Sequence, residues 1–303
     1  MKLGLSPDAV RSARELVELG RRIEDAGFAS VWVPDHLAFF GSPTIDPFQA
    51  LTAFAAGSRH LELGTSVLVL PLRAAALVAK SAASLDVLCE GRLTLGVGVG
   101  GEFPGEYEAA GVPLAERGPR LDEAIGVLRH LWSGSGAPFA GRFSSLRAGT
   151  RLNPLPARAG GPPIWVGGRA EVAIRRAARA ADGYLGFLLD PTGFSQRMQQ
   201  LRTLAAELGR DPRGILGGLL AFCHVADDAE AAVERVAKRL EANYGVPMRA
   251  AVERYGIVGS RVQCLERIAA YARAGVEHLV LTSPFRGAEF DAQLPEMARL
   301  LAP

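Results

Sequence analysis

The sequence predicts an α/β protein whose parallel strands close into a (β/α)8 TIM barrel. Short β-rich segments alternate with longer amphipathic segments along the 303 residues. Because a connection between parallel strands usually takes a helix, this alternation favours a parallel sheet. Eight strand–helix units are the number that closes a barrel. An open, doubly wound sheet is the alternative fold.

Eight segments have the apolar and β-branched composition of buried strands. They are residues 3–5, 30–33, 63–70, 93–99, 163–166, 183–188, 217–225 and 277–281. Between most of them apolar residues recur at helical spacing, which predicts helices at 11–26, 74–88, 117–132, 171–180, 193–208, 227–243, 260–274 and 290–301. Gly27 is a stop signal for the first helix, and Ser260 with Gln263 forms a capping box for the helix 260–274.

The segment 134–162 interrupts this alternation between the fourth and fifth strands. It is rich in glycine and proline and too long for a simple connecting loop. We therefore expect an insertion, with a small hairpin around residues 139–146. Because no internal repeat or linker is recognisable in the sequence, we expect one domain over residues 1–303.

The composition is that of a soluble globular protein and disfavours several partners. A balance of 34 Lys+Arg against 32 Asp+Glu leaves a charge of +2, whereas nucleic-acid binding needs a basic face. No apolar run approaches the ~20 residues of a membrane span, and the N-terminus lacks the apolar core of a signal peptide. The cysteines are far apart and lack metal-site spacing. We expect a cytoplasmic protein that binds neither nucleic acid nor membrane and holds no metal.

Several reactions that barrels commonly catalyse lack their residues here. The five histidines form no pair near a strand end, which disfavours a metallohydrolase. Lys80 and Lys238 fall in predicted helices and Lys2 precedes the first strand, so no lysine is placed for a Schiff base. The Gly-x-Ser-x-Gly elbow of serine hydrolases is absent from the sequence.

Polar residues after the second and fourth strands are the candidates for catalysis, because barrel active sites lie at the carboxyl ends of strands. Asp35 and His36 follow the second strand; an aspartate can hold a histidine tautomer, and a histidine can move a proton. Glu102 and Glu106 follow the fourth strand, and each could face the barrel mouth. The alternatives are a histidine held by a turn and two solvated loop acids.

Two glycine-rich strand ends indicate a close approach of the backbone to another group. The fourth strand ends in a weak match to the Gly-x-Gly-x-x-Gly dinucleotide fingerprint, since no helix opens directly after it. The cofactor-binding candidates there are Gly98, Gly100 and Gly101. Gly167 and Gly168 precede a helix, where bare amides favour a phosphate and Arg169 adds positive charge. Ordinary glycine turns are the alternative at both places.

Taken in order, these motifs resemble the bacterial luciferase-like family of flavin- and deazaflavin-dependent oxidoreductases. The stretch Val-Trp-Val-Pro-Asp-His at 31–36 resembles the family's second strand, and residues 84–98 resemble its most recognisable segment. The other resembling segments are 24–28, 63–71, 162–168, 181–184, 258–260 and 274–278. Each motif is weak alone, but the ordered set covers nearly the whole chain.

The resemblance implies a barrel that binds coenzyme F420 or FMN in its mouth. In F420-dependent members it implies that Asp35 and His36 lie near the reacting ring. It also implies a non-proline cis peptide between Ser66 and Val67 that backs the ring. An acid after the fourth strand often acts as a proton donor, and Glu102 and Glu106 compete for this role. The cofactor phosphate is then expected on the turn of Gly167 and Gly168.

We therefore expect an F420-dependent oxidoreductase that transfers a hydride between the deazaflavin and a small organic substrate. Neither coenzyme needs a protein nucleophile or a metal, since the ring carries the hydride. An FMN-dependent monooxygenase that uses reduced flavin and oxygen is the nearest alternative, and a non-catalytic flavin-binding homologue is the third. Substrate choice would fall to the loops 37–44 and 134–160, with Phe39 and Phe40 as a candidate apolar wall. A homodimer is a candidate assembly.

Overall fold

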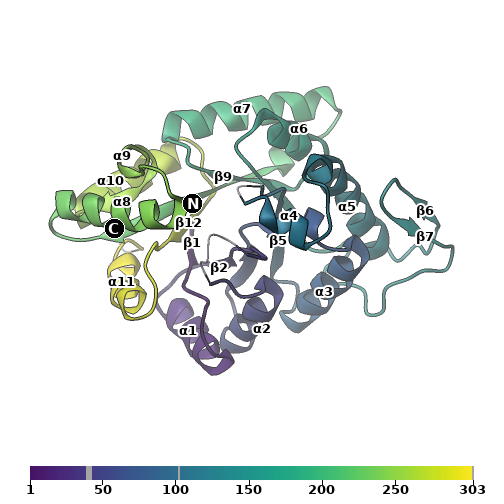
Figure 1. The fold of residues 1–303 in the computed structure, drawn as a ribbon, viewed down its shortest axis with the longest axis horizontal. Coiled ribbons are helices and arrows are strands. Elements are labelled where there is room, and N and C mark those ends of the chain that lie inside the picture. The colour runs from purple at the N-terminus through teal and green to yellow at the C-terminus, as the bar shows by residue number, and fades with distance from the viewer. Residues whose placement is uncertain (39–42, 102, 302–303) are drawn as a thin grey trace.

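Eight parallel strands form a closed barrel, as the sequence predicts (Figure 1). A computed structural model describes residues 1–38, 43–101 and 103–301. Each strand pairs in parallel with the next, and the last pairs with the first. In spatial order the strands are β1 (Lys2–Ser6), β2 (Ser30–Val33), β3 (Glu62–Thr65), β5 (Leu93–Gly98), β8 (Ile164–Gly167), β9 (Gly183–Phe187), β10 (Leu216–Val225) and β12 (His278–Thr282).

Two short strands differ from the prediction. The expected strand 63–70 is divided at the Ser66–Val67 peptide, which is cis as predicted, and β4 (Leu68–Val69) then pairs with β5. The strand β11 (Ile257–Gly259) was not predicted; it pairs with the last three residues of β10. The end of β10 therefore leaves the barrel wall and continues toward β11.

Helices surround the barrel and cover its outer face (Figure 1). The expected helices are α1 (Ala13–Asp25), α3 (Ala75–Leu88), α5 (Arg117–Trp132), α6 (Glu171–Ala180), α7 (Pro191–Glu207), α8 (Ala229–Tyr244), α10 (Arg261–Arg273) and α11 (Ala288–Ala298). The capping box of Ser260 and Gln263 is present at the start of α10. Three further helices were not predicted: α2 (Pro47–Gly57), α4 (Gly105–Ala109) and α9 (Arg249–Tyr255).

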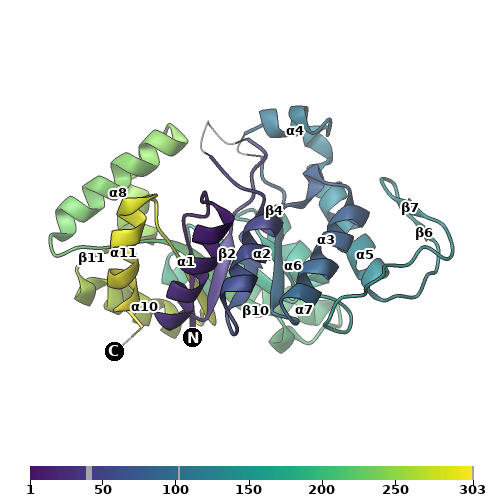
Figure 2. The ribbon, with the colours of Figure 1, turned by 90° about the horizontal axis from the view of Figure 1, so that it is seen from below.

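The insertion between the fourth and fifth barrel strands contains the expected hairpin. The strands β6 (Phe139–Ala140) and β7 (Ser145–Leu146) pair antiparallel and project beside α5 (Figures 1 and 2). The Glu123 carboxylate on α5 accepts hydrogen bonds from the amides of Arg142 and Phe143 and so ties the hairpin to the helix layer. The hairpin lies at the side of the molecule, away from the barrel axis (Figure 2).

The inside of the barrel is filled by side chains around two tryptophans. The rings of Trp32 and Trp165 are 5.4 Å apart between centroids and pack with Leu185 and Val280. Glycines on the neighbouring strands leave room for the indoles, because a Cβ atom at Gly64 or Gly183 would collide with them. The carboxyl ends of the strands form the mouth, on the same side as α4 and the raised end of α8 (Figure 2).

Among the described residues, no helix is both long and apolar enough to cross a bilayer.

Candidate functional site

A histidine and a buried glutamate meet at the barrel mouth. His36 follows β2, and Glu106 lies on α4, which follows β5. The His36 Nδ1 atom is 3.2 Å from both carboxylate oxygens of Glu106, and the Ala38 amide donates to Glu106 Oε1 at 3.0 Å. Glu106 is fully buried, whereas the His36 side chain is 22% exposed. Because a carboxylate only accepts, the contact places a proton on Nδ1.

Asp35, the neighbour of His36, bonds to protein groups on two sides. Its carboxylate accepts from Arg73 at 2.7 Å and from the Val69 amide at 3.0 Å. Arg73 also bonds Asp46, which caps the start of α2. Burial raises the pKa of the Asp35 carboxyl, and the Arg73 guanidinium opposes that shift. Asp35 therefore links the end of β2 to the chain after β3, and its contact with a cofactor stays a prediction.

The glycines that end β5 and β8 are packed against the segment after β3. A Cβ atom at Gly98 would lie 2.5 Å from the Val67 side chain, and one at Gly167 would lie 2.7 Å from it. The lack of a Cβ atom at Gly98 and Gly167 therefore leaves space for the Val67 side chain. Gly100 and Gly101 have φ angles of 54° and 105°, which L side chains rarely adopt.

One polar atom of this segment lacks a partner. The Ser66 hydroxyl oxygen is buried and forms no hydrogen bond with the protein. An unsatisfied buried hydroxyl is unfavourable, so this serine is a candidate for a ligand contact. Ser66 and Val67 follow β3 at its carboxyl end, and their contact with a cofactor stays a prediction.

The turn between β8 and α6 has the features expected of an anion site. Gly168 has a φ of 144° and is followed by Arg169, which is exposed. The N-cap residue of α6, Ala170, offers no side-chain hydrogen bond to the first-turn amides. Amides at an uncapped helix start carry partial positive charge. A phosphate on this turn stays a prediction.

The described part of the chain covers the competing acids and the loop phenylalanines only in part. Of the two competing acids, Glu106 is the one that reaches His36, whereas Glu102 lies outside the described residues. Phe39 and Phe40 also lie outside them. The described residues contain no cluster of three or more His, Cys, Asp or Glu side chains that could hold a metal ion.

Sequence reasoning missed the apolar side of the mouth. Phe187 ends β9, Phe222 lies near the end of β10, and Phe285 follows β12. The rings of Phe187 and Phe222 are 5.5 Å apart, and His224 lies 4.9 Å from the Phe285 ring. Alternation along β10 was the available signal, because residues at even numbers from Gly218 onward share one face of the strand.

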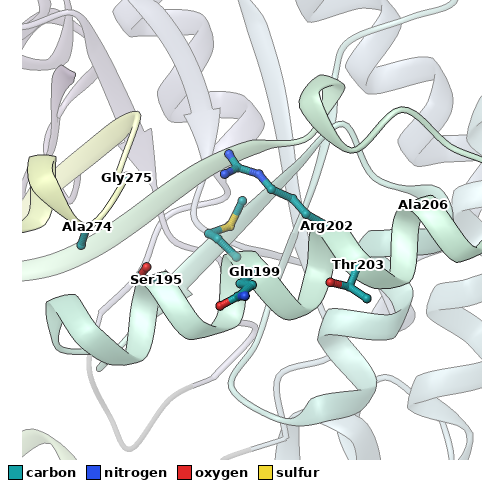
Figure 3. Close-up of a pocket in the computed structure, with 8 residues that line it drawn as sticks. Ser195, Gln199, Arg202, Thr203, Ala206, Ala274 and Gly275 are labelled. Carbon is teal, nitrogen blue, oxygen red and sulfur yellow. The ribbon is translucent and has the colours of Figure 1, made fainter.

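A surface pocket of about 490 Å³ lies beside α7 (Figure 3). Ser195, Gln199 and Arg202 of α7 line it, together with Gly275, which precedes β12. Because Gly275 lies at the amino end of a barrel strand, this pocket is not part of the mouth.

Comparisons with known proteins agree with this architecture. The profile of the family described as Luciferase-like monooxygenase matches residues 2–251. An uncharacterised protein of Mycobacterium tuberculosis is 36% identical over 213 residues, which cover 64% of this chain and 72% of the relative. An F420-dependent glucose-6-phosphate dehydrogenase of Rhodococcus hoagii is 33% identical over 193 residues, which cover 61% of this chain and 56% of the enzyme.

Two solved structures share the fold. An F420-dependent secondary alcohol dehydrogenase with an F420–acetone adduct superposes with a TM-score of 0.86 and 20% identity, over 100% of this chain and 99% of that one. The oxygenating constituent of 3,6-diketocamphane monooxygenase from Pseudomonas putida, with FMN, gives a TM-score of 0.80 and 17% identity, over 100% and 96%. The same barrel therefore occurs with either coenzyme.

Proposed function

The chain belongs to the luciferase-like monooxygenase family of oxidoreductases, and from this we propose that it is an F420-dependent enzyme that moves a hydride between the deazaflavin and a small organic substrate. The observation that carries the proposal is the contact of His36 with the buried Glu106 at the mouth. Hydride transfer to or from an oxygen-bearing carbon also requires a proton acceptor or donor. Curated relatives named as F420-dependent enzymes favour the deazaflavin.

Two features at the barrel mouth support the binding of such a coenzyme. The partnerless hydroxyl oxygen of Ser66 can bond a polar ligand atom beside Val67. The uncapped start of α6, with Gly168 and Arg169 before it, can receive a phosphate. We assign ring contacts to the chain at Ser66–Val67 and at Gly98–Gly101, and phosphate contacts to the turn at Gly167–Arg169.

In this proposal the coenzyme transfers the hydride, and His36 and Glu106 handle the proton. When bound, the deazaflavin supplies a two-electron acceptor or donor of hydride. Oxidation of an alcohol also releases a proton from oxygen, and we assign that proton to His36 Nε2. Glu106 holds the proton at Nδ1, orients the ring and stabilises the imidazolium that results. In the reverse direction His36 returns the proton to the carbonyl oxygen.

An FMN-dependent monooxygenase remains the second candidate, because the barrel of an FMN-bound monooxygenase superposes at a TM-score of 0.80. Titration of the purified protein with F420 and with FMN at identical salt separates the two. We expect the tighter dissociation constant for F420. Tighter FMN binding, with oxygen consumption in the presence of reduced FMN, would establish the monooxygenase instead. Binding of neither coenzyme would leave the non-catalytic homologue.

The same titration, carried out with a variant of the turn between β8 and α6, tests the proposed phosphate contact. Arg169→Glu places a negative charge beside the turn and should weaken F420 binding about tenfold at low salt, with less effect at high salt. A valine at Gly168 is a poorer test, because its Cβ would lie 2.8 Å from the Ala173 Cβ and the φ of 144° disfavours any side chain. Arg175→Glu, one turn into α6, is the matched control.

A further inference from the structure

We propose that the substrate is an uncharged alcohol or carbonyl compound with an aromatic or branched apolar group, which packs on Phe187, Phe222 and Phe285 and hydrogen-bonds to His224. These three phenylalanines are called the aromatic wall below. The inference rests on the proposed function and adds the substrate class to it.

The aromatic wall faces His36 across the mouth. In the order β1, β2, β3, β5, β8, β9, β10, β12, the strands β2 and β9 are four positions apart and so lie on opposite sides of the barrel. His36 follows β2, and Phe187 ends β9. Phe187 is partly exposed and packs with the buried Phe222 at an interplanar angle of 74°. A substrate that reaches His36 from this side meets aromatic carbon.

His224 is a polar group without a polar partner in this wall. Gly218 and Leu220 of β10 contact the tryptophan cluster inside the barrel, whereas His224 lies in the last three residues of β10, which pair with β11, and its ring lies 4.9 Å from Phe285. The residue is 3% exposed, and its Nδ1 atom has no hydrogen-bond partner. A substrate hydroxyl or carbonyl oxygen would satisfy it.

The imidazole of His224 is neutral near pH 7. Burial, followed by the charge of Arg235, lowers the pKa of His224 to about 4, whereas Glu289 opposes that shift. Arg235 on α8 and Glu289 at the start of α11 pair with each other at 2.5 Å. A neutral imidazole can donate to a carbonyl or accept from a hydroxyl, but it offers no charge to an anion.

The arginines around Phe285 donate to protein oxygens. Arg235 forms an ion pair with Glu289, whereas Arg239 and Arg286 donate to the neutral carbonyls of Pro284 and Pro43 and keep their charge. Among the described residues, the lysines lie elsewhere: Lys2 pairs with Glu62 at the opposite end of the barrel, and Lys80 and Lys238 are on outer helices. A dianionic phosphate would need a cation to offset its desolvation. The three phenylalanine rings and the neutral His224 imidazole supply no such cation, so the aromatic wall itself favours an uncharged substrate.

The test uses the protein loaded with oxidised F420 and two matched compounds. In the forward reaction 1-phenylethanol becomes acetophenone: its carbon gives a hydride to the coenzyme, and its hydroxyl gives a proton to His36. We expect kcat/KM for 1-phenylethanol to exceed that for 4-(1-hydroxyethyl)benzoate and for glucose 6-phosphate at least tenfold. Isothermal calorimetry should show acetophenone binding at least tenfold tighter than 4-acetylbenzoate.

Ethylbenzene, which lacks the carbonyl oxygen of acetophenone, separates a hydrogen bond from His224 from simple packing against its ring. His224→Phe should weaken acetophenone binding threefold or more while leaving ethylbenzene binding unchanged or tighter. His224→Gln should recover part of the loss, and His130→Phe on α5 is the control. An equal loss for both probes would make His224 structural and overturn its assignment, and so would an unchanged acetophenone affinity.

Preference for a charged compound, or absence of binding by every neutral compound when F420 binds, would overturn the substrate class while leaving the proposed function in place. Failure of F420 to bind would instead reject the proposed function. If His224→Phe does not fold, the wild-type comparison of neutral and charged compounds and the His224→Gln variant still decide the question.

Discussion

Glu106 is a fully buried carboxylate, and its two partners explain how it is tolerated. It accepts from His36 Nδ1 and from the Ala38 amide, so both groups come from the segment after β2. Buried charges are retained where they are paired and hydrogen-bonded. Sequence analysis placed His36 at a strand end correctly but expected Asp35 to hold its tautomer, whereas Asp35 bonds Arg73 and Glu106 contacts His36. The contact was missed because the orientation of a helix as short as α4 cannot be deduced from periodicity.

His36→Ala should reduce kcat/KM at least a hundredfold through the loss of acid–base catalysis. It should also lower the melting temperature, because the buried Glu106 carboxylate loses one of its two hydrogen-bond partners. His60→Ala, at an exposed position, should change neither quantity. Steady-state kinetics and thermal melts check both. Full activity in His36→Ala would remove its catalytic role.

Ser66→Ala distinguishes a ligand contact from a structural hydroxyl. Because the Ser66 oxygen has no hydrogen-bond partner in the protein, its removal should leave the unliganded melting temperature unchanged or slightly higher. Coenzyme affinity should fall about threefold to tenfold, as expected for one lost hydrogen bond. Fluorescence titration gives the affinity. A large drop in unliganded stability, with affinity unchanged, would contradict this assignment.

At the scale of elements, one arginine connects three pieces of the mouth. Arg73 follows the short helix after β4, and it bonds Asp35 after β2 and Asp46 at the start of α2. Successive parallel strands are connected by long crossovers and not by tight turns. Hydrogen bonds between side chains near their carboxyl ends therefore help to hold these ends in fixed relative positions. The Asp35–Arg73–Asp46 chain supplies such a link behind His36.

Arg73→Met should lower the free energy of unfolding by about 3 kcal/mol, since it leaves Asp35 buried without its cation. Adding Asp35→Asn should recover part of this loss, because a neutral amide is cheaper to bury than an unpaired carboxylate. The exposed Arg59→Met should change stability by no more than about 0.5 kcal/mol. Urea unfolding measures all three. No recovery in the double variant would mean that the arginine acts through Asp46 alone.

The elements that sequence reasoning missed share a physical cause. The helix α2 is apolar around much of its circumference and packs against α1 and α3, so it lacks the polar face that marks a surface helix. The strand β11 has three residues, too few to show an alternating pattern, and it pairs with the end of β10. Longer elements with one buried face, such as α1 and α10, were located to within a few residues.

At the scale of the whole molecule, the two ends of the barrel have different chemistry. The mouth contains His36, Glu106 and a partnerless serine hydroxyl, whereas the lower interior contains a closed polar cluster beneath the tryptophans. There His278 Nε2 lies 2.7 Å from the Ser30 hydroxyl, which accepts from the Trp32 indole at 2.8 Å. The indole N–H also points to His278 Nε2 at 3.4 Å, so Nε2 is an acceptor and the Ser30 hydroxyl donates to it. The barrel composition predicted neither this cluster nor its burial, since both depend on which side chains share a layer.

That cluster makes the stability of the barrel depend on pH. Burial lowers the pKa of His278 to about 4, with Lys2 adding to this shift and Glu62 opposing it. In the unfolded chain His278 binds a proton near pH 6.5, whereas in the folded chain it stays neutral down to about pH 4. The free energy of unfolding is therefore greatest above pH 6.5 and falls as the pH drops toward 4. The slope is about 1.4 kcal/mol per pH unit for one histidine, and His224, shifted in the same direction, contributes similarly. Urea unfolding at pH 7.5, 6.5, 5.5 and 4.5 should show this loss, and His278→Gln should remove about half of the slope. Two results would contradict this: a wild-type free energy of unfolding that stays constant between pH 6.5 and 5, or a His278→Gln variant with the full pH slope. Either would show that His278 is protonated in the folded protein at the same pH as in the unfolded chain.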